Sequence, residues 1–177
     1  MKKLYVPLIL FIFLIAEGLS INHLPYEIAF SDYLIIAHWI LAFLVYIAVY
    51  YDIENTYYAI AYGFLFGLFI DIIYTGVLGV YMFSYGIVMY ILHLLQKLLH
   101  RNVFVLIFFG TIAFVLGDLL IYIMYAVVGI TEMVWRDYWL LRSLPTLVAN
   151  LLFLLLLFPI FKNRIMKWSM EQVEKES

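Results

Sequence analysis

Residues 59–79, AIAYGFLFGLFIDIIYTGVLG, form an apolar run in which Asp71 is the single charged residue. A second run, residues 103–125 (VFVLIFFGTIAFVLGDLLIYIMY), likewise contains one charge, Asp118. About 20 consecutive apolar residues suffice for a helix to cross a bilayer, so both runs predict membrane-spanning helices. The composition agrees: 68% of the 177 residues are hydrophobic and 12% are charged, whereas soluble domains have about 25% charged residues.

Six apolar runs of this kind can be placed along the chain. Their predicted bounds are Leu4–Ile21, Tyr33–Tyr51, Tyr57–Thr75, Val80–Leu95, Val103–Val128 and Leu144–Phe161. The predicted fold class is therefore an all-α integral membrane protein with a six-helix transmembrane domain over residues 1–161. Because only Gly76-Val77-Leu78-Gly79 separates the third span from the fourth, these two spans are expected to form a tight helical hairpin.

The two ends of the chain need separate interpretation. Residues 162–177 are too polar to insert, and they predict a C-terminal tail. This tail could be an interfacial helix with Ile165, Met166 and Trp168 at the membrane, or a frayed end. The first apolar run could imitate a signal peptide, but Glu17 follows it and no clear A-x-A cleavage site appears. An uncleaved first span is therefore predicted, with cleavage as the alternative.

The basic residues predict how the bundle is oriented. Eight of the ten Lys and Arg residues fall on one side of the predicted membrane: Lys2, Lys3, Lys97, Arg101, Lys162, Arg164, Lys167 and Lys175. Arg136 and Arg142 fall on the other side. By the positive-inside rule, the chain is predicted to be a multi-pass membrane protein with both termini in the cytoplasm.

Charge, cysteine content and motifs argue against several classes of function. The net charge of −2 gives no basis for nucleic-acid binding, and the lack of cysteine excludes thiolate metal sites and cysteine nucleophiles. The sequence contains no H-E-x-x-H helix, phosphate-binding loop or G-x-S-x-G elbow. Asp71 and Asp118 could form an aspartic dyad only within about 3 Å of each other, and both lack the Tyr-Asp and Gly-x-Gly-Asp signatures of intramembrane aspartyl proteases. The prediction is a protein with no catalytic residues, metal or cofactor.

Intramembrane polar residues are the strongest candidates for a functional site. A carboxylate near the bilayer centre costs roughly 2.5–3.5 kcal/mol, so Asp71 and Asp118 each need a partner, a pocket or water. At about 1.5 Å per residue, both lie in the outer half of the membrane, at a depth shared with other polar side chains. Arg142 is a candidate ion partner, and Tyr74 or Tyr122 could donate hydroxyls. The predicted cluster, opening outward, comprises Glu17, His38, Asp71, Asp118, Arg142 and Asn150.

This cluster admits three interpretations: a structural ion-pair or hydrogen-bond network, a ligand or ion pocket, and a contact with a partner protein. Individual members have simpler roles as alternatives. Glu17 and His38 could be interfacial residues that reach water. Asn150 could link two helices by hydrogen bonds rather than contact a ligand.

Small residues predict where helices approach closely. Gly63, Gly67 and Asp71 are spaced four apart, so they form one stripe along a helix. Two glycines in this stripe would let a neighbouring backbone approach and bring hydrogen-bond partners to the carboxylate. The full set of predicted packing glycines is Gly63, Gly67, Gly76, Gly79 and Gly117.

Two segments give the chain a family resemblance. Residues 62–91, YGFLFGLFIDIIYTGVLGVYMFSYGIVMYI, and the R-x-x-P-T-x-x-x-N pattern from Arg142 to Asn150 resemble the bacterial MreD family of rod shape-determining proteins. The most specific part is Gly-Phe-x-x-Gly-x-x-x-Asp, ending at Asp71. The resemblance covers essentially the whole chain, and it singles out Asp71 with its two glycines.

The resemblance implies a non-enzymatic membrane subunit of the cell-elongation machinery that organises peptidoglycan synthesis. The implied partners are MreC directly, and MreB, RodA and a class B penicillin-binding protein in the wider complex, besides membrane lipid; a homodimer stays open. The family is also similar in fold to the substrate-binding subunits of energy-coupling-factor transporters. Two hypotheses follow: a scaffold that binds MreC and maintains rod shape, or a solute-binding transporter subunit.

Overall fold

The computed structural model describes residues 4–22, 33–52, 56–97, 99 and 101–176. Most of these residues are helical, and none of them lies in a strand. The helices are α1 (Tyr5–Asn22), α3 (Trp39–Tyr46), α4 (Tyr58–Ile70), α5 (Val80–Gln96), α6 (Val103–Val127), α7 (Trp135–Asp137) and α8 (Leu144–Glu176). Three π-helical segments extend them: η2 (Ile47–Tyr51) follows α3, η3 (Asp71–Thr75) follows α4, and η4 (Tyr138–Ser143) precedes α8.

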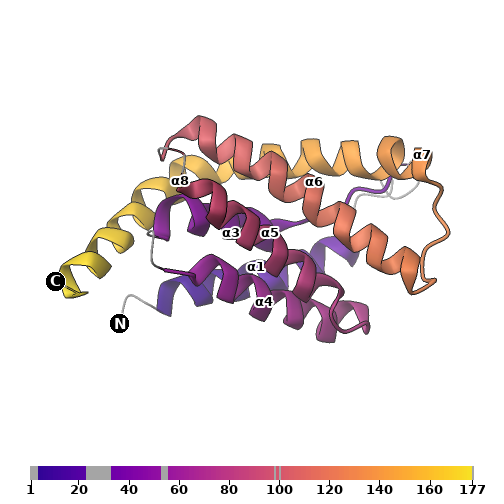
Figure 1. Cartoon of the computed structure of the whole chain (residues 1–177), viewed down its shortest axis with the longest axis horizontal. Coiled ribbons are helices and arrows are strands. Elements are labelled where there is room, and N and C mark those ends of the chain that lie inside the picture. The colour runs from indigo at the N-terminus through magenta and orange to yellow at the C-terminus, as the bar shows by residue number, and fades with distance from the viewer. Residues whose placement is uncertain (1–3, 23–32, 53–55, 98, 100, 177) are drawn as a thin grey trace.

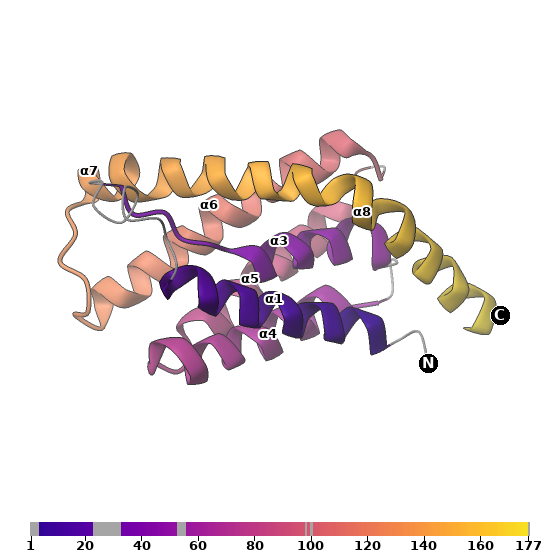
Figure 2. The same ribbon diagram turned by 180° about the vertical axis from the view of Figure 1, so that it is seen from behind.

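The helices pack side by side along the long axis of the molecule (Figures 1 and 2). The start of α1 and the end of α8 lie at the same end of the bundle, whereas the α4–α5 turn and α7 lie at the other. The centre is formed by α3 and η2, in which every residue from Ile40 to Tyr51 is buried. The other long helices surround this central segment and carry the exposed hydrophobic side chains.

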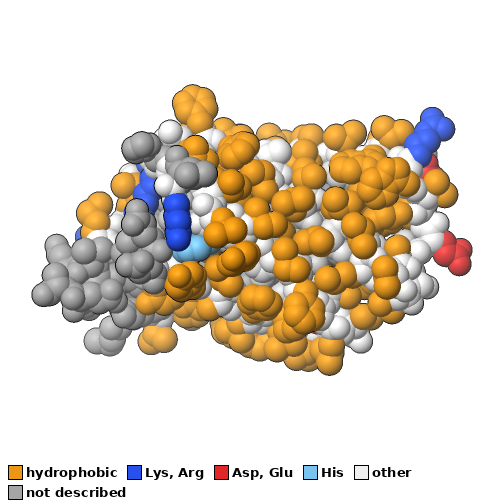
Figure 3. Space-filling model, viewed as in Figure 1, with side chains coloured by type: hydrophobic (Ala, Val, Ile, Leu, Met, Phe, Trp, Pro, Cys, Tyr) orange, Lys and Arg blue, Asp and Glu red, His pale blue; other side chains and the backbone are white. Residues whose placement is uncertain are grey.

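The outer surface has the character expected of a membrane protein. Hydrophobic side chains cover the middle of the face in Figure 3, while charged side chains on that face appear only near its two ends. Among the described residues, the helical stretches Tyr58–Thr75, Val103–Val127 and Trp135–Glu171 are long and apolar enough to cross a membrane. The apolar stretches Tyr5–Ser20, Trp39–Tyr51 and Val80–Gln96 are shorter. The all-α membrane class is therefore confirmed, whereas six complete crossings stay a prediction.

The predicted second span, Tyr33–Tyr51, is wrong in its first third. Residues 33–38 are not helical, and the helix begins only at Trp39. The physical reason is that the backbone of this segment bonds to α8 instead of to its own next turn. An extended chain rises about 3.3 Å per residue and a helix about 1.5 Å, so the two parts together still reach roughly 40 Å.

The predicted last span, Leu144–Phe161, and the predicted tail form one helix, because α8 continues without a break to Glu176. Pro159 lies inside this helix, and the helix bends near there and crosses the end of the bundle (Figures 1 and 2). Ile165 is fully buried in the protein core. The expectation that Ile165 lies at the membrane surface is therefore wrong, because the bundle itself offers it an apolar site.

The α4–α5 hairpin depends on glycine in two ways. A Cβ atom on Gly67 would lie 2.6 Å from the backbone oxygen of Tyr81, and one on Gly63 would lie 3.2 Å from that of Tyr85, so the two backbones touch. Gly76 and Gly79 instead adopt positive φ angles of 67° and 101°, which L-residues with a side chain rarely adopt.

The role predicted for Gly76 therefore needs correction. A Cβ atom there would meet nothing within 4 Å, so Gly76 serves the turn conformation rather than helix packing. Gly117 of α6 is a packing position, because its Cβ would lie 2.9 Å from the side chain of Leu41 in α3.

Candidate functional site

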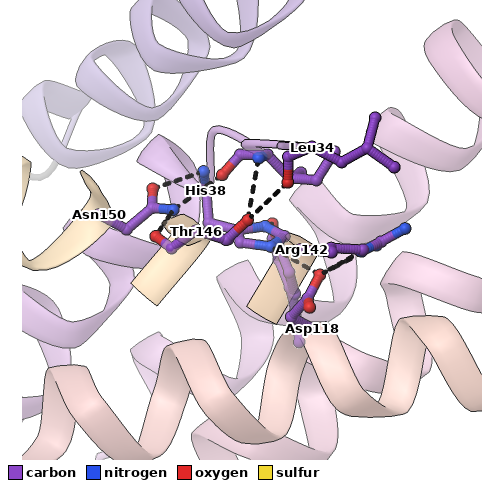
Figure 4. Close-up of polar contacts among 8 residues, drawn as sticks. Leu34, His38, Asp118, Arg142, Thr146 and Asn150 are labelled. Carbon is purple, nitrogen blue, oxygen red and sulfur yellow. Dashed lines mark hydrogen bonds and ion pairs between the residues drawn. The ribbon is translucent and has the colours of Figure 1, made fainter. Parts of the chain in front are cut away.

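The extended segment before α3 is held by two polar side chains of α8. The Thr146 hydroxyl accepts a hydrogen bond from the Ile36 amide (3.1 Å) and donates one to the Leu34 carbonyl (3.2 Å). Asn150 accepts from the His38 amide (2.8 Å) and donates to the Ile36 carbonyl (2.8 Å). Figure 4 shows the two side chains reaching toward the segment. Irregular backbone at membrane depth requires such partners, because lipid offers none.

The N-terminus of α3 is capped by a carboxylate from another helix. Glu17 of α1 is 5% exposed, and its Oε2 accepts a hydrogen bond from the Ile40 amide at 3.0 Å. The first amides of a helix have no partner within the helix, and the positive end of the helix dipole lies there. Glu17 therefore supplies a hydrogen-bond acceptor to a buried helix N-terminus. The amide that it binds belongs to Ile40, two residues after His38 in the chain.

Asp118 of α6 pairs with Arg142 of η4. The guanidinium Nε and Nη2 atoms lie 3.1 Å and 2.9 Å from the same carboxylate oxygen, Oδ1. The Asp118 side chain is 2% exposed and that of Arg142 is 14% exposed. The pair thus joins the middle of the bundle to the end that carries α7, with the arginine on the more accessible side.

His38 completes this arrangement. Its Nε2 lies 3.6 Å from Asp118 Oδ1, which is beyond hydrogen-bond distance, and its Nδ1 lies 3.0 Å from the Tyr85 hydroxyl. Because the His38 amide binds Asn150, this one residue connects the ion pair to the extended segment. Among the described residues, Asp118 Oδ2, His38 Nε2 and the Tyr138 hydroxyl are buried without a hydrogen-bond partner.

Asp71 lies outside this network and has a different role. Its Oδ2 accepts hydrogen bonds from the amides of Gly79 (2.9 Å) and Met82 (3.1 Å), and its Oδ1 accepts one from Tyr81 (2.9 Å). These amides begin α5, so the carboxylate of one hairpin helix caps the N-terminus of the next.

The tyrosine hydroxyls expected on the two aspartates bind elsewhere. Tyr74 donates to the Leu14 carbonyl (2.9 Å), and Tyr122 donates to that of Met133 (2.8 Å). In both cases a main-chain oxygen is the acceptor, so the prediction of hydroxyl donors to Asp71 or Asp118 is wrong.

The structure thus brings together Glu17, His38, Asp118, Arg142 and Asn150 and leaves Asp71 apart. Sequence reasoning did not select Thr146 or Tyr85. Thr146 had a usable signal, because it lies one helical turn before Asn150, on the same face of α8. Tyr85 had none, since tyrosine is common throughout the chain.

The network consists of hydrogen bonds and an ion pair that hold neighbouring helices and the extended segment together. The polar groups of Glu17, Thr146 and Asn150 bind main-chain groups, and the Asp118 carboxylate pairs with Arg142. In the part of the chain that the structure describes, no group of three or more His, Asp or Glu residues could hold a metal ion. These contacts favour the structural interpretation over the ligand pocket, since most of the acceptors are occupied by protein donors and Asp118 Oδ2 is the exception.

Replacing Asn150 with leucine is expected to lower the melting temperature and to release the extended segment. The substitution leaves the His38 amide and the Ile36 carbonyl without their hydrogen-bond partner, which lowers the free energy of unfolding by roughly 1–3 kcal/mol. Thermal unfolding in detergent and amide exchange at residues 34–38 would measure the two effects. Asn163→Leu is the matched control, because Asn163 is exposed on the same helix. Equal melting temperatures for the two variants would show that Asn150 does not hold the segment.

Comparison with known proteins gives one family. A family model described as rod shape-determining protein MreD matches residues 1–167. Rod shape-determining protein MreD of Bacillus subtilis (strain 168) is 27% identical over 164 residues, which cover 91% of this chain and 94% of that protein. No solved structure matches the chain.

Proposed function

The chain belongs to the MreD family of rod shape-determining proteins, and we propose that it is a non-enzymatic membrane scaffold that binds MreC and helps organise peptidoglycan synthesis along the cell cylinder. The family match over residues 1–167 carries this proposal, because it covers the helices from α1 to η4 entirely and α8 as far as Lys167. MreB, RodA and a class B penicillin-binding protein are the proposed partners in the wider complex. Both termini are proposed to face the cytoplasm.

The internal contacts support a scaffold. Helix ends and unwound backbone are tied by side chains from distant parts of the sequence, as at Glu17, Asp71 and Asn150. Such ties fix the relative positions of the helices, which a protein that presents a constant surface to a partner requires. The alternative, a solute-binding subunit of an energy-coupling-factor-type transporter, would instead need polar groups free to contact a solute.

One experiment separates the two functions. The tagged chain would be purified from native membranes in mild detergent, and proteins and small molecules in the same sample would be identified by mass spectrometry. The scaffold predicts co-purification of MreC and no tightly bound metabolite. Deleting the gene should convert rods to spheres, and the wild-type chain should restore the rods. Cells that stay rod-shaped without the chain, together with no recovered MreC, would reject the proposal.

A further inference from the structure

The apolar helical stretch that includes most of α8 is longer than a membrane crossing requires. This stretch, Trp135–Glu171, has 37 residues, which at about 1.5 Å per residue gives roughly 55 Å. The hydrocarbon core of a bilayer is about 30 Å thick. Because charged side chains avoid the hydrocarbon core, the C-terminal part of this stretch, which carries Lys162, Arg164 and Lys167, is assigned to the outside of the core, at the end of the bundle where α1 begins.

This C-terminal part is held against the bundle. The Ser169 hydroxyl donates to the carbonyl of Tyr51 at 3.1 Å, and Ile165 is fully buried. The Trp168 ring stacks on Tyr5 of α1 with 5.6 Å between ring centroids. Because α8 bends near Pro159 (Figure 2), these contacts fix the segment across the bundle end rather than along its axis.

The opposite face of the segment is basic. Arg164 and Lys167 are exposed, and their spacing of three residues places them on one side of the helix. Lys162, five residues before Lys167, lies on another side of the helix, with its ammonium 5.1 Å from the centre of the Phe158 ring. Tyr and Trp residues such as Tyr5 and Trp168 are typical of the membrane–water interface.

Neighbouring segments add positive charge at this end of the bundle, whereas on α8 itself Glu171, four residues after Lys167, adds one negative charge to the same side. Lys97 and Arg101 are exposed, and Arg101 is tied to the end of η2 through the Asp52 carbonyl at 2.7 Å. The Asp52 carboxylate is buried and accepts amides of Tyr58 (3.0 Å) and Ala59 (2.9 Å) at the start of α4. This acid is therefore turned toward α4 instead of toward the basic face.

From this geometry we propose that the docked segment of α8, residues 162–170, binds the phosphate groups of anionic phospholipids through Arg164 and Lys167. The proposal does not depend on MreC binding. Each basic residue near an anionic membrane surface contributes about 1 kcal/mol, which corresponds to roughly a fivefold preference. The two exposed cations together predict a preference for anionic over zwitterionic lipid of about 25-fold.

Native mass spectrometry of the full chain tests this. The purified protein would receive equal amounts of phosphatidylglycerol and phosphatidylcholine in mixed micelles, and the lipids retained on it would be counted. The wild type should retain phosphatidylglycerol preferentially. The double variant Arg164→Gln/Lys167→Gln should lose roughly 25-fold of that preference, with an unchanged melting temperature because both side chains are exposed.

Arg136→Gln is the matched control, because Arg136 is exposed at the opposite end of the bundle, in α7. It should retain the wild-type preference. Raising the salt concentration to about 1 M, where the Debye length is about 3 Å, should weaken the wild-type preference. Equal retention of the two lipids by the wild type, or the same loss in Arg136→Gln as in the double variant, would overturn the proposal.

Discussion

Replacing Asp71 with leucine is expected to open the α4–α5 hairpin and to destabilise the chain by roughly 3–5 kcal/mol. The carboxylate accepts three main-chain amides at the start of α5, from Gly79, Tyr81 and Met82. Leucine would leave all three without a protein partner in a region where lipid supplies no acceptor. Thermal unfolding in detergent and amide exchange at the start of α5 would measure the loss.

Asp71→Asn gives the graded test of this role. The asparagine oxygen can replace one carboxylate oxygen, but its NH₂ group would face an amide donor. We expect a destabilisation between those of the wild type and Asp71→Leu. Asp137→Leu is the control, because Asp137 is exposed in α7. A wild-type melting temperature for Asp71→Leu would show that the cap contributes nothing to folding.

The helices of the α4–α6 region could be predicted closely because their ends carry strong local signals. Two glycines with positive φ close the turn before Val80, and the Asn102 side chain caps α6 by accepting the Val105 amide at 2.8 Å. The predicted spans Tyr57–Thr75, Val80–Leu95 and Val103–Val128 accordingly end within about a residue of the observed helices. Local chemistry determined these bounds.

The unwound segment before α3 could not be predicted, because its determinants are distant in sequence. Residues 34–36 are as apolar as the residues of a membrane-spanning helix. Hydrophobicity alone therefore does not distinguish a helical from an extended conformation for this segment. The side chains that hold the segment, Thr146 and Asn150, lie 110 or more residues away. Without knowledge of that contact, a continuous helix is the simpler expectation.

The two buried aspartates illustrate the same limit for the candidate site. Membrane depth correctly indicates that each carboxylate needs a partner, and Arg142 was predicted as a candidate. Depth does not say that Asp71 finds its partners in the main chain of its own hairpin, about ten residues further on. The two aspartates therefore have different roles although they are predicted at a similar depth. Asp71 caps a helix, and Asp118 forms an ion pair.

Removing Arg142 is expected to be as damaging as removing Asp71, but a second substitution should rescue it. Arg142→Gln leaves the Asp118 carboxylate, 2% exposed, without its cation, and breaking a buried pair in this way costs roughly 3–5 kcal/mol. Asp118→Asn/Arg142→Gln removes both charges, so the double variant should be more stable than Arg142→Gln alone. Unfolding of the two single variants and the double variant would give the coupling energy of the pair. Additive effects of the two substitutions would mean that Asp118 is not stabilised by Arg142, and the ion pair would then have no part in holding α6 to η4.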